Sequence, residues 1–196
     1  NFVRPVNLAD GTQLLALHGV NNTMQARGSL YLFEPLADTP LSTTAISTKT
    51  PLGSMSVTDT NGDGNDELLM GSSSVLSGAA FMEFDVQQAS QSIWNLEQVK
   101  NELDKFGYRV AQSEFINDGG TNKYLTLFGS RMILLPESKN AAEAEVLVND
   151  YAYNDMWQAT SGKIILASAQ TGGSNVHIID TSHAQWKEQY AALAPA

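Results

Sequence analysis

Short apolar runs recur in pairs along the chain, and each has the length of a β-strand rather than of a helix. The four pairs lie at 13–19 and 29–33, 67–71 and 80–85, 124–129 and 132–135, and 163–167 and 176–180. Short apolar runs bounded by Gly, Ser or Asn are typical of buried strands. The pattern therefore predicts an all-β fold made of four similar units.

The loop at 59–67 carries oxygen-bearing side chains at alternate positions. Asp59, Asn61, Asp63 and Glu67 occupy its first, third, fifth and ninth positions, and Asn65 offers a backbone carbonyl at the seventh. Glycines 62 and 64 allow the tight backbone that turns these oxygens inward. Calcium takes about six to eight oxygen ligands, so the loop predicts one calcium site made by these five residues.

The residues after the loop separate two kinds of calcium site. An EF-hand has a Glu at position twelve and continues into a helix, whereas position twelve here is Met70, inside an apolar run stopped by Gly and Ser. This order of loop and strand resembles the FG-GAP and VCBS type of calcium-binding β-propeller repeat. The resemblance implies a propeller fold and a role in adhesion, matrix attachment or polysaccharide handling. Glu67 departs from the Asp more usual at position nine, a variant that should still bind calcium.

The spacing of the repeats agrees with a propeller. The small residues that close the first run of each pair, Gly19, Gly71, Gly129 and Ala167, are 52, 58 and 38 residues apart, which brackets the ~40–50 residues of a typical blade. We expect a β-propeller with four blade-like units at about 1–48, 49–94, 107–148 and 149–196. Because related propellers usually have seven or eight blades, we expect these four to belong to a larger ring. Closure as a four-bladed ring, or pairing with a second copy, are the alternatives.

Finer predictions concern the first strand of each unit and two helices. First strands are expected at 2–6, 54–58, 109–112 and 146–148, and Asp155–Trp157 is expected to stand in the turn of the fourth unit. Apolar residues at helical spacing predict a helical insertion near 95–106. A second helix is predicted at 182–193, with an outer strand as the alternative.

The composition limits which kinds of partner the protein is expected to bind and in which compartment it is expected to lie. The chain has 196 residues, a net charge of −10 and no Cys, and no apolar run approaches the ~20 residues of a membrane span. The negative charge disfavours binding to nucleic acids and to anionic membrane surfaces. Together with the expected calcium dependence, these features predict a secreted, periplasmic or cell-surface protein.

Candidate catalytic residues are few. The sequence contains no serine-hydrolase elbow, phosphate loop or zinc-binding His pair. His18 is the candidate base, because it ends a strand expected to be an inner one, close to the central channel of a propeller. We therefore expect a chain that is not itself an enzyme.

Aromatic residues near predicted loops suggest a binding surface instead. Trp157, Tyr151 and Tyr153 could present aromatic faces to sugar rings, although burial between blades is the alternative. The leading interpretation is a secreted, calcium-stabilised module that binds carbohydrate or an extracellular matrix or adhesion partner. The alternatives are a polysaccharide lyase or hydrolase of the propeller type, with His18 or a tyrosine as base, and a structural scaffold.

Overall fold

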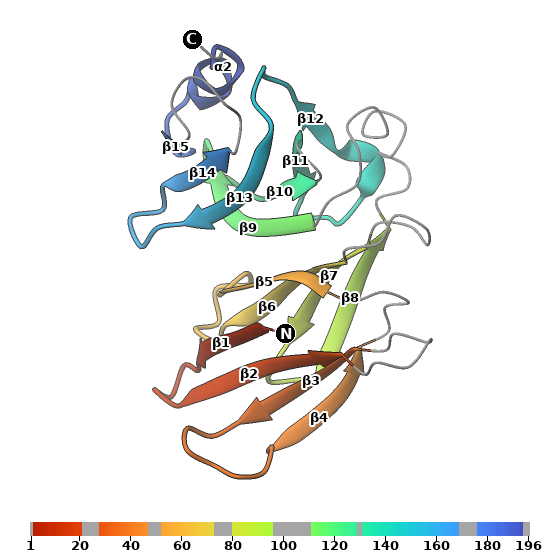
Figure 1. Ribbon diagram of the computed structural model, residues 1–196. Coiled ribbons are helices and arrows are strands. Elements are labelled where there is room, and N and C mark those ends of the chain that lie inside the picture. Colours follow the sequence, from red (N-terminus) through yellow and green to blue (C-terminus); the bar gives the residue numbers. More distant parts are fainter. Residues whose placement is uncertain are drawn as a thin grey trace.

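The computed structural model describes residues 2–20, 28–46, 52–72, 80–95, 111–128, 131–168 and 176–193 (Figure 1). Within these ranges the strands form four antiparallel sheets, three of four strands and one of three. Sheet 1 contains β1 (Phe2–Asn7), β2 (Gln13–Val20), β3 (Gly28–Phe33) and β4 (Ser42–Ile46). Sheet 2 contains β5 (Leu52–Thr58), β6 (Glu67–Ser72), β7 (Ala80–Asp85) and β8 (Ser90–Asn95).

Sheets 3 and 4 follow the same plan. Sheet 3 contains β9 (Ala111–Asp118), β10 (Thr121–Phe128), β11 (Arg131–Pro136) and β12 (Glu145–Leu147), and sheet 4 contains β13 (Tyr153–Gln158), β14 (Ile164–Ser168) and β15 (Val176–Ile179). Each strand pairs with the next strand along the chain, so every sheet is an up-and-down meander. This is the form of a propeller blade, and the expected all-β propeller architecture is confirmed.

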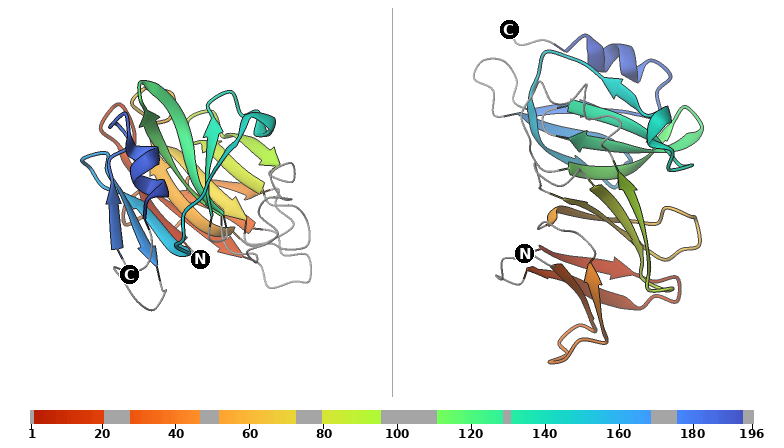
Figure 2. Two further views of the ribbon diagram at one scale, coloured as in Figure 1. Left: turned by 90° about the horizontal axis from the view of Figure 1, so that it is seen from above. Right: turned by 90° about the vertical axis from the view of Figure 1, so that its right-hand side faces the viewer.

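The sheets stack in chain order. In Figure 1, sheet 1 lies lowest with sheet 2 above it, and sheets 3 and 4 lie side by side in the upper half, with sheet 4 on the left. The right-hand view of Figure 2 also places sheets 1 and 2 below sheets 3 and 4. The first strands meet along one side, where β1 packs beside β5, β5 beside β9 and β9 beside β13. These four strands are therefore the inner strands, next to the propeller axis.

Three apolar clusters correspond to the three contacts between neighbouring sheets. Sheets 1 and 2 share a cluster that includes Val6, Leu14, Leu68 and Phe84. Sheets 2 and 3 share a second cluster, in which Leu69, Phe81, Tyr124, Ile133 and Leu135 are buried. Sheets 3 and 4 share the third, which also receives Trp186 and Tyr190 from the C-terminal helix. The core thus lies between the blades.

The fourth unit differs from the sequence prediction. Val146 and Leu147 pair with Ile133 and Met132 of β11, so the strand expected to open sheet 4 is the last strand of sheet 3. Sheet 4 opens instead with β13, in the segment that was expected to be a turn. The strand signal was weak there because only Tyr153 and Met156 are buried, and a register shift between 153 and 155 breaks the two-residue alternation.

Helical structure is limited in the described residues. Helix α2 (Trp186–Ala191) lies within the helix predicted at 182–193, and a 3₁₀ turn, η3 (Ala141–Glu143), precedes β12. The insertion predicted near 95–106 lies outside the described residues except for Asn95, which ends β8. No described helix combines the length and apolar character that a bilayer crossing requires.

Candidate functional site

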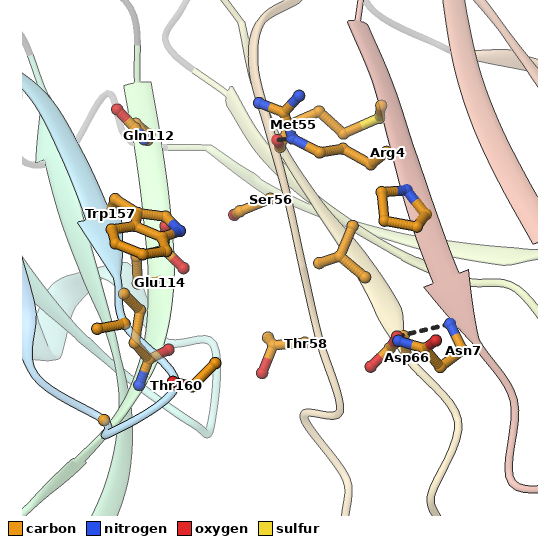
Figure 3. Close-up of a pocket in the computed structure, with 15 residues that line it drawn as sticks. Arg4, Asn7, Met55, Ser56, Thr58, Asp66, Gln112, Glu114, Trp157 and Thr160 are labelled. Carbon is orange, nitrogen blue, oxygen red and sulfur yellow. Dashed lines mark hydrogen bonds between the residues drawn. The ribbon is translucent and has the colours of Figure 1, made fainter. Parts of the chain in front are cut away.

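The inner strands of all four sheets line one cavity of about 520 Å³ at the axis (Figure 3). Strands β1, β5, β9 and β13 each contribute residues, and so do Asp66 and the turn after β13. Most of the lining side chains are polar: Arg4, Asn7, Ser56, Thr58, Asp66, Gln112, Glu114, Gln158 and Thr160. The fold therefore brings together hydrogen-bonding groups that are far apart in the sequence.

Arg4 is the cationic residue of the cavity lining. Its Nε donates a hydrogen bond of 2.9 Å to the carbonyl oxygen of Met55, and one terminal nitrogen donates to the carbonyl of Val3 at 3.0 Å. Within the described part of the chain it forms no ion pair. The guanidinium group is thus fixed between sheets 1 and 2 by neutral acceptors, and its charge can attract an anion.

Glu114 is a nearly buried carboxyl group on the same cavity, with 5% of its surface exposed. Burial raises its pKa to about 7, and the charge of Asp155 adds to this effect. A hydrogen bond with the backbone of Gln158 and the positive charge of Arg4 lower the pKa, but they only partly compensate. Glu114 therefore gains or loses a proton near neutral pH.

Trp157 presents its indole ring to the cavity. It follows Met156, which is 1% exposed, so the alternation of β13 turns Trp157 outward and leaves it 57% exposed. Figure 3 shows the ring on the side of the cavity opposite Arg4. A large exposed aromatic face is suited to stacking against a sugar ring. The ligand-binding role expected for Trp157 stays a prediction. In the structure Trp157 lines the cavity together with its polar side chains.

The other two aromatic candidates do not face solvent. Tyr151 is 5% exposed and Tyr153 is fully buried, with their rings stacked at 5.9 Å. The Tyr153 hydroxyl lies 2.9 Å from Nδ1 of His177 and accepts a hydrogen bond from Asn149. Packing between sheets 3 and 4 accounts for this burial, so the expectation that these two rings are available to a ligand is wrong.

His18 does not reach the axis. It lies on β2, the second strand of sheet 1, and it is fully buried. Burial lowers its pKa to about 4, and neither ring nitrogen has a hydrogen-bond partner among the described residues. The expectation of an inner-strand base close to the channel is wrong, because β1 rather than β2 is the inner strand of sheet 1.

The loop predicted to bind calcium connects β5 to β6, the first two strands of sheet 2. Asp59 accepts hydrogen bonds from the backbone amides of Gly62 and Gly64 at 2.7 and 2.9 Å. Asn61 accepts from the amide of Asp63, and Asp63 accepts from the amide of Asn65, both at 2.8 Å. The alternate oxygens thus order the loop backbone.

The charges of this loop are crowded. Glu67 is 2% exposed, and its carboxylate accepts two hydrogen bonds from Thr60. Burial raises the pKa of Glu67, and the nearby charges of Asp63 and Asp59 raise it further. A bound cation would relieve this repulsion. Across the described ranges, however, no three His, Asp or Glu side chains already converge as a metal site, so calcium binding stays a prediction.

The same loop joins sheet 2 to sheet 1. Asp66 accepts hydrogen bonds from the backbone and side-chain nitrogens of Asn7 at 2.7 and 2.9 Å. The side-chain oxygen of Asn65 accepts from the amide of Ala9 at 3.0 Å and from Gln87. The loop therefore holds β1 in place beside β5, at the edge of the axial cavity.

Comparison with known proteins identifies the kind of propeller. A family model described as the lambda-carrageenase beta-propeller domain matches residues 1–179. The chain belongs to this family. The match supports a β-propeller, but the family differs from the FG-GAP and VCBS repeats that the calcium loop resembles.

Two curated relatives match the chain over all 196 residues. One is the lambda-carrageenase of Pseudoalteromonas carrageenovora, which is 47% identical, and the other is a lambda-carrageenase of a Pseudoalteromonas species, which is 46% identical. The chain spans 21% of the length of each relative. The expectation of a chain that is not itself an enzyme is corrected by this finding, because both relatives are named as enzymes and the similarity covers the whole chain.

Sequence reasoning did not select Arg4 or Glu114 as functional residues. Arg4 is the one charged residue of the segment FVRPVN, whereas Glu114 shares the segment AQSEFIND with Asp118 and with three neutral polar residues. The isolated charge of Arg4 was therefore the available signal. Its role depends on which strands lie at the axis, and the sequence does not specify the order of strands in the sheets.

The buried carboxyl of Glu114 predicts a pH-dependent stability. Because its pKa is raised in the folded state, folding is favoured at low pH, and the stabilisation is lost as the pH rises from ~4.5 through about 7. The loss amounts to roughly 3 kcal/mol. We expect Glu114→Gln to remove this part of the difference in unfolding free energy between pH 5 and pH 8, measured by urea denaturation. Equal pH dependence in both proteins would contradict the burial of an ionisable carboxyl.

The close packing of Gly28 on His18 predicts a coupled pair of substitutions. A Cβ at Gly28 would lie 2.4 Å from Nε2 of His18, so Gly28→Ala should destabilise the protein by ~1–3 kcal/mol. In a His18→Ala background the same substitution should cost much less, because the ring is gone. Urea denaturation of the four proteins measures the coupling energy, and strictly additive effects would show that the two residues are not in contact.

Calcium binding by the loop predicts ligand-dependent stability. Calcium at about 100 times its Kd should stabilise the protein by ~2.7 kcal/mol, and a chelator should reverse the gain. Asp63→Asn should abolish most of the calcium response, whereas Asp38→Asn, in an exposed turn, should preserve it. Thermal unfolding with and without calcium provides the measurement. A wild-type Tm that is indifferent to calcium would exclude a stabilising site in this loop.

Proposed function

We propose that this chain is part of the propeller of an enzyme that degrades λ-carrageenan, and that its axial cavity binds the polysaccharide. The observation that carries the proposal is the 47% identity to a lambda-carrageenase over the full 196 residues. The hydrolase alternative drawn from the sequence agrees with these relatives better than a binding module that acts by itself.

The chemistry of the cavity supports a sugar ligand that carries negative charge. Carrageenans are sulfated galactans, so a binding site needs a flat apolar surface for the pyranose ring and a donor for sulfate oxygens. Trp157 offers the first and the guanidinium of Arg4 offers the second, and both line the same cavity. Charge-assisted hydrogen bonds of this kind contribute ~1.5–3 kcal/mol each.

The net charge of −10 does not oppose this proposal. At physiological ionic strength the charges of exposed groups are screened over ~8 Å, so distant carboxylates act weakly on a ligand inside the cavity. The electrostatic interaction with a ligand inside the cavity is decided by the nearby groups Arg4 and Glu114. The raised pKa of Glu114 leaves much of that carboxyl uncharged at neutral pH. The acidic exterior instead disfavours nonspecific attachment of a polyanion.

The substrate also supports the predicted location. A long charged polysaccharide does not cross a bilayer, so an enzyme that degrades it has to meet it outside the cytoplasm. We therefore propose that the protein is secreted or held at the cell surface. A glycan is its proposed partner, rather than an adhesion protein.

Two measurements test the proposal. A longer protein that contains this chain should release reducing ends from λ-carrageenan, and the 196-residue chain should be retarded in native gels that contain the polymer. Trp157→Ala and Arg4→Gln should each weaken binding ~10-fold, which corresponds to ~1.4 kcal/mol. Leu36→Ala, at a fully exposed position outside the cavity, is the matched control.

The outcomes separate the two parts of the proposal. Release of reducing ends, with retardation unchanged in Trp157→Ala and Arg4→Gln, would contradict the cavity as the binding site and leave the enzyme assignment in place. A longer protein that releases no reducing ends from λ-carrageenan would contradict the assignment itself. Unfolding curves of each variant show whether weaker binding reflects lost structure, because Arg4 also contacts Met55.

A further inference from the structure

Side chains of one inner strand bind the backbone of the next inner strand around the axis. On β1, Arg4 donates a hydrogen bond of 2.9 Å to the carbonyl oxygen of Met55 in β5. On β5, the hydroxyl of Ser56 donates to the carbonyl oxygen of Ser113 in β9. Each inner strand ends its own sheet, so its axial edge has no strand partner there. Side chains of the neighbouring sheet take the place of that partner.

The contact between β9 and β13 contains two such side chains. Oε1 of Gln112 accepts a hydrogen bond of 3.1 Å from the backbone amide of Met156, which also donates to the Asp155 carboxylate, and Nε2 of Gln112 donates to the carbonyl oxygen of Met156. Two residues further along each strand, Glu114 binds the backbone of Gln158. Positions i and i+2 of a strand present their backbone groups to the same edge. Gln112 and Glu114 therefore bind the axial edge of β13 together.

Trp157 lies between these two backbone contacts. It is the residue between Met156 and Gln158, and Figure 3 shows it on the same side of the cavity as Gln112 and Glu114. The side chain of Met156 is buried between sheets 3 and 4, whereas Trp157 is 57% exposed and lines the axial cavity. Because packing covers less than half of Trp157, the position of its ring depends on the backbone that carries it.

Strand β13 is held only weakly by its own sheet. Its pairing with β14 has a register shift between Tyr153 and Asp155, directly before the segment that carries Trp157. Of its six residues only Tyr153 and Met156 are buried. A strand with an interrupted ladder, one neighbour in the sheet and few buried side chains opens easily. The hydrogen bonds from β9 therefore fix the backbone at 156–158.

We propose that Gln112 and Glu114 are positioning residues of the glycan site, which hold the indole of Trp157 at the axial cavity by fixing the backbone on both sides of it. This inference rests on the proposed function, in which a sugar ring stacks on Trp157. Stacking requires the two rings to meet face to face, so a displaced or mobile indole loses contact with the sugar. Gln112 and Glu114 act on the ligand through Trp157.

Methionine substitutions test each contact, because Met is about as long as Gln and Glu but its thioether is a weak acceptor and donates no hydrogen bond. Gln112→Met removes both hydrogen bonds to Met156, and Glu114→Met removes the acceptor for the backbone of Gln158. Glu114→Gln keeps an acceptor and is the conservative variant. Gln91→Met, at an exposed position of the outer strand β8, is the matched control.

The position of the indole is measured by NMR of the 196-residue chain. The chain has three tryptophans, and the indole N–H signal of Trp157 is the one that disappears in Trp157→Ala. We expect this signal to shift or broaden in Gln112→Met and in Glu114→Met. It should stay near its wild-type position in Glu114→Gln and in Gln91→Met.

Calorimetric titration with a λ-carrageenan oligosaccharide measures the effect on binding. Gln112→Met and Glu114→Met should each weaken binding ~5-fold, less than the ~10-fold expected for Trp157→Ala. In a Trp157→Ala background, Gln112→Met should cause no further loss of affinity, because the residue acts through the indole. A direct contact between Gln112 and the sugar, or a general loss of structure, would instead give additive losses.

The outcomes distinguish this inference from the proposed function. The positioning role is overturned by additive losses in the double variant, or by an unchanged Trp157 signal in both methionine variants. It is also overturned if both methionine variants bind as the wild type does while Trp157→Ala binds more weakly, and the glycan site then stands. Equal affinity of Trp157→Ala and the wild type would contradict the proposed site, and the positioning role would fall with it. If Gln112→Met does not fold, Glu114→Met decides by the same criteria.

Discussion

Apolar contact between neighbouring sheets is the interaction on which the whole structure depends. The buried side chains divide into three clusters, and each cluster lies between two sheets that are adjacent in the chain. Because sheet 2 buries one set of residues on each face, its strand β6 contains the run Leu68–Leu69–Met70 without polar interruption. This arrangement sets the angle and order of the blades, and thereby brings β1, β5, β9 and β13 together at the axis.

The polar groups lie where this apolar packing ends. At the axis the inner strands have no further sheet to cover them, so Arg4, Glu114 and Trp157 face a shared cavity. The acidic loop at 59–67 lies at its margin and connects sheet 2 to sheet 1 through Asp66 and Asn7. The stack therefore supplies both a rigid frame and a cavity whose lining residues come from four separate strands.

The sequence predicted the second and third strands of all four sheets, because each of them contains a short apolar run. Strand β13 was missed, since only Tyr153 and Met156 of it are buried and a bulge shifts its register. Of the residues that line the axial cavity, the sequence selected Trp157 alone as a ligand-binding candidate. Burial of Tyr153, and the position of His18 on the second strand, depend on how the sheets stack, which no local pattern in the sequence specifies.

The central claim is that the axial cavity is where λ-carrageenan binds. The most direct test is a crystal or cryo-electron microscopy structure of a longer protein that contains this chain, prepared with a λ-carrageenan oligosaccharide. The account predicts density for a sugar ring against the indole of Trp157, with a sulfate group within hydrogen-bonding distance of the Arg4 guanidinium. Well-ordered oligosaccharide elsewhere in the protein, with an unoccupied axial cavity, would contradict it.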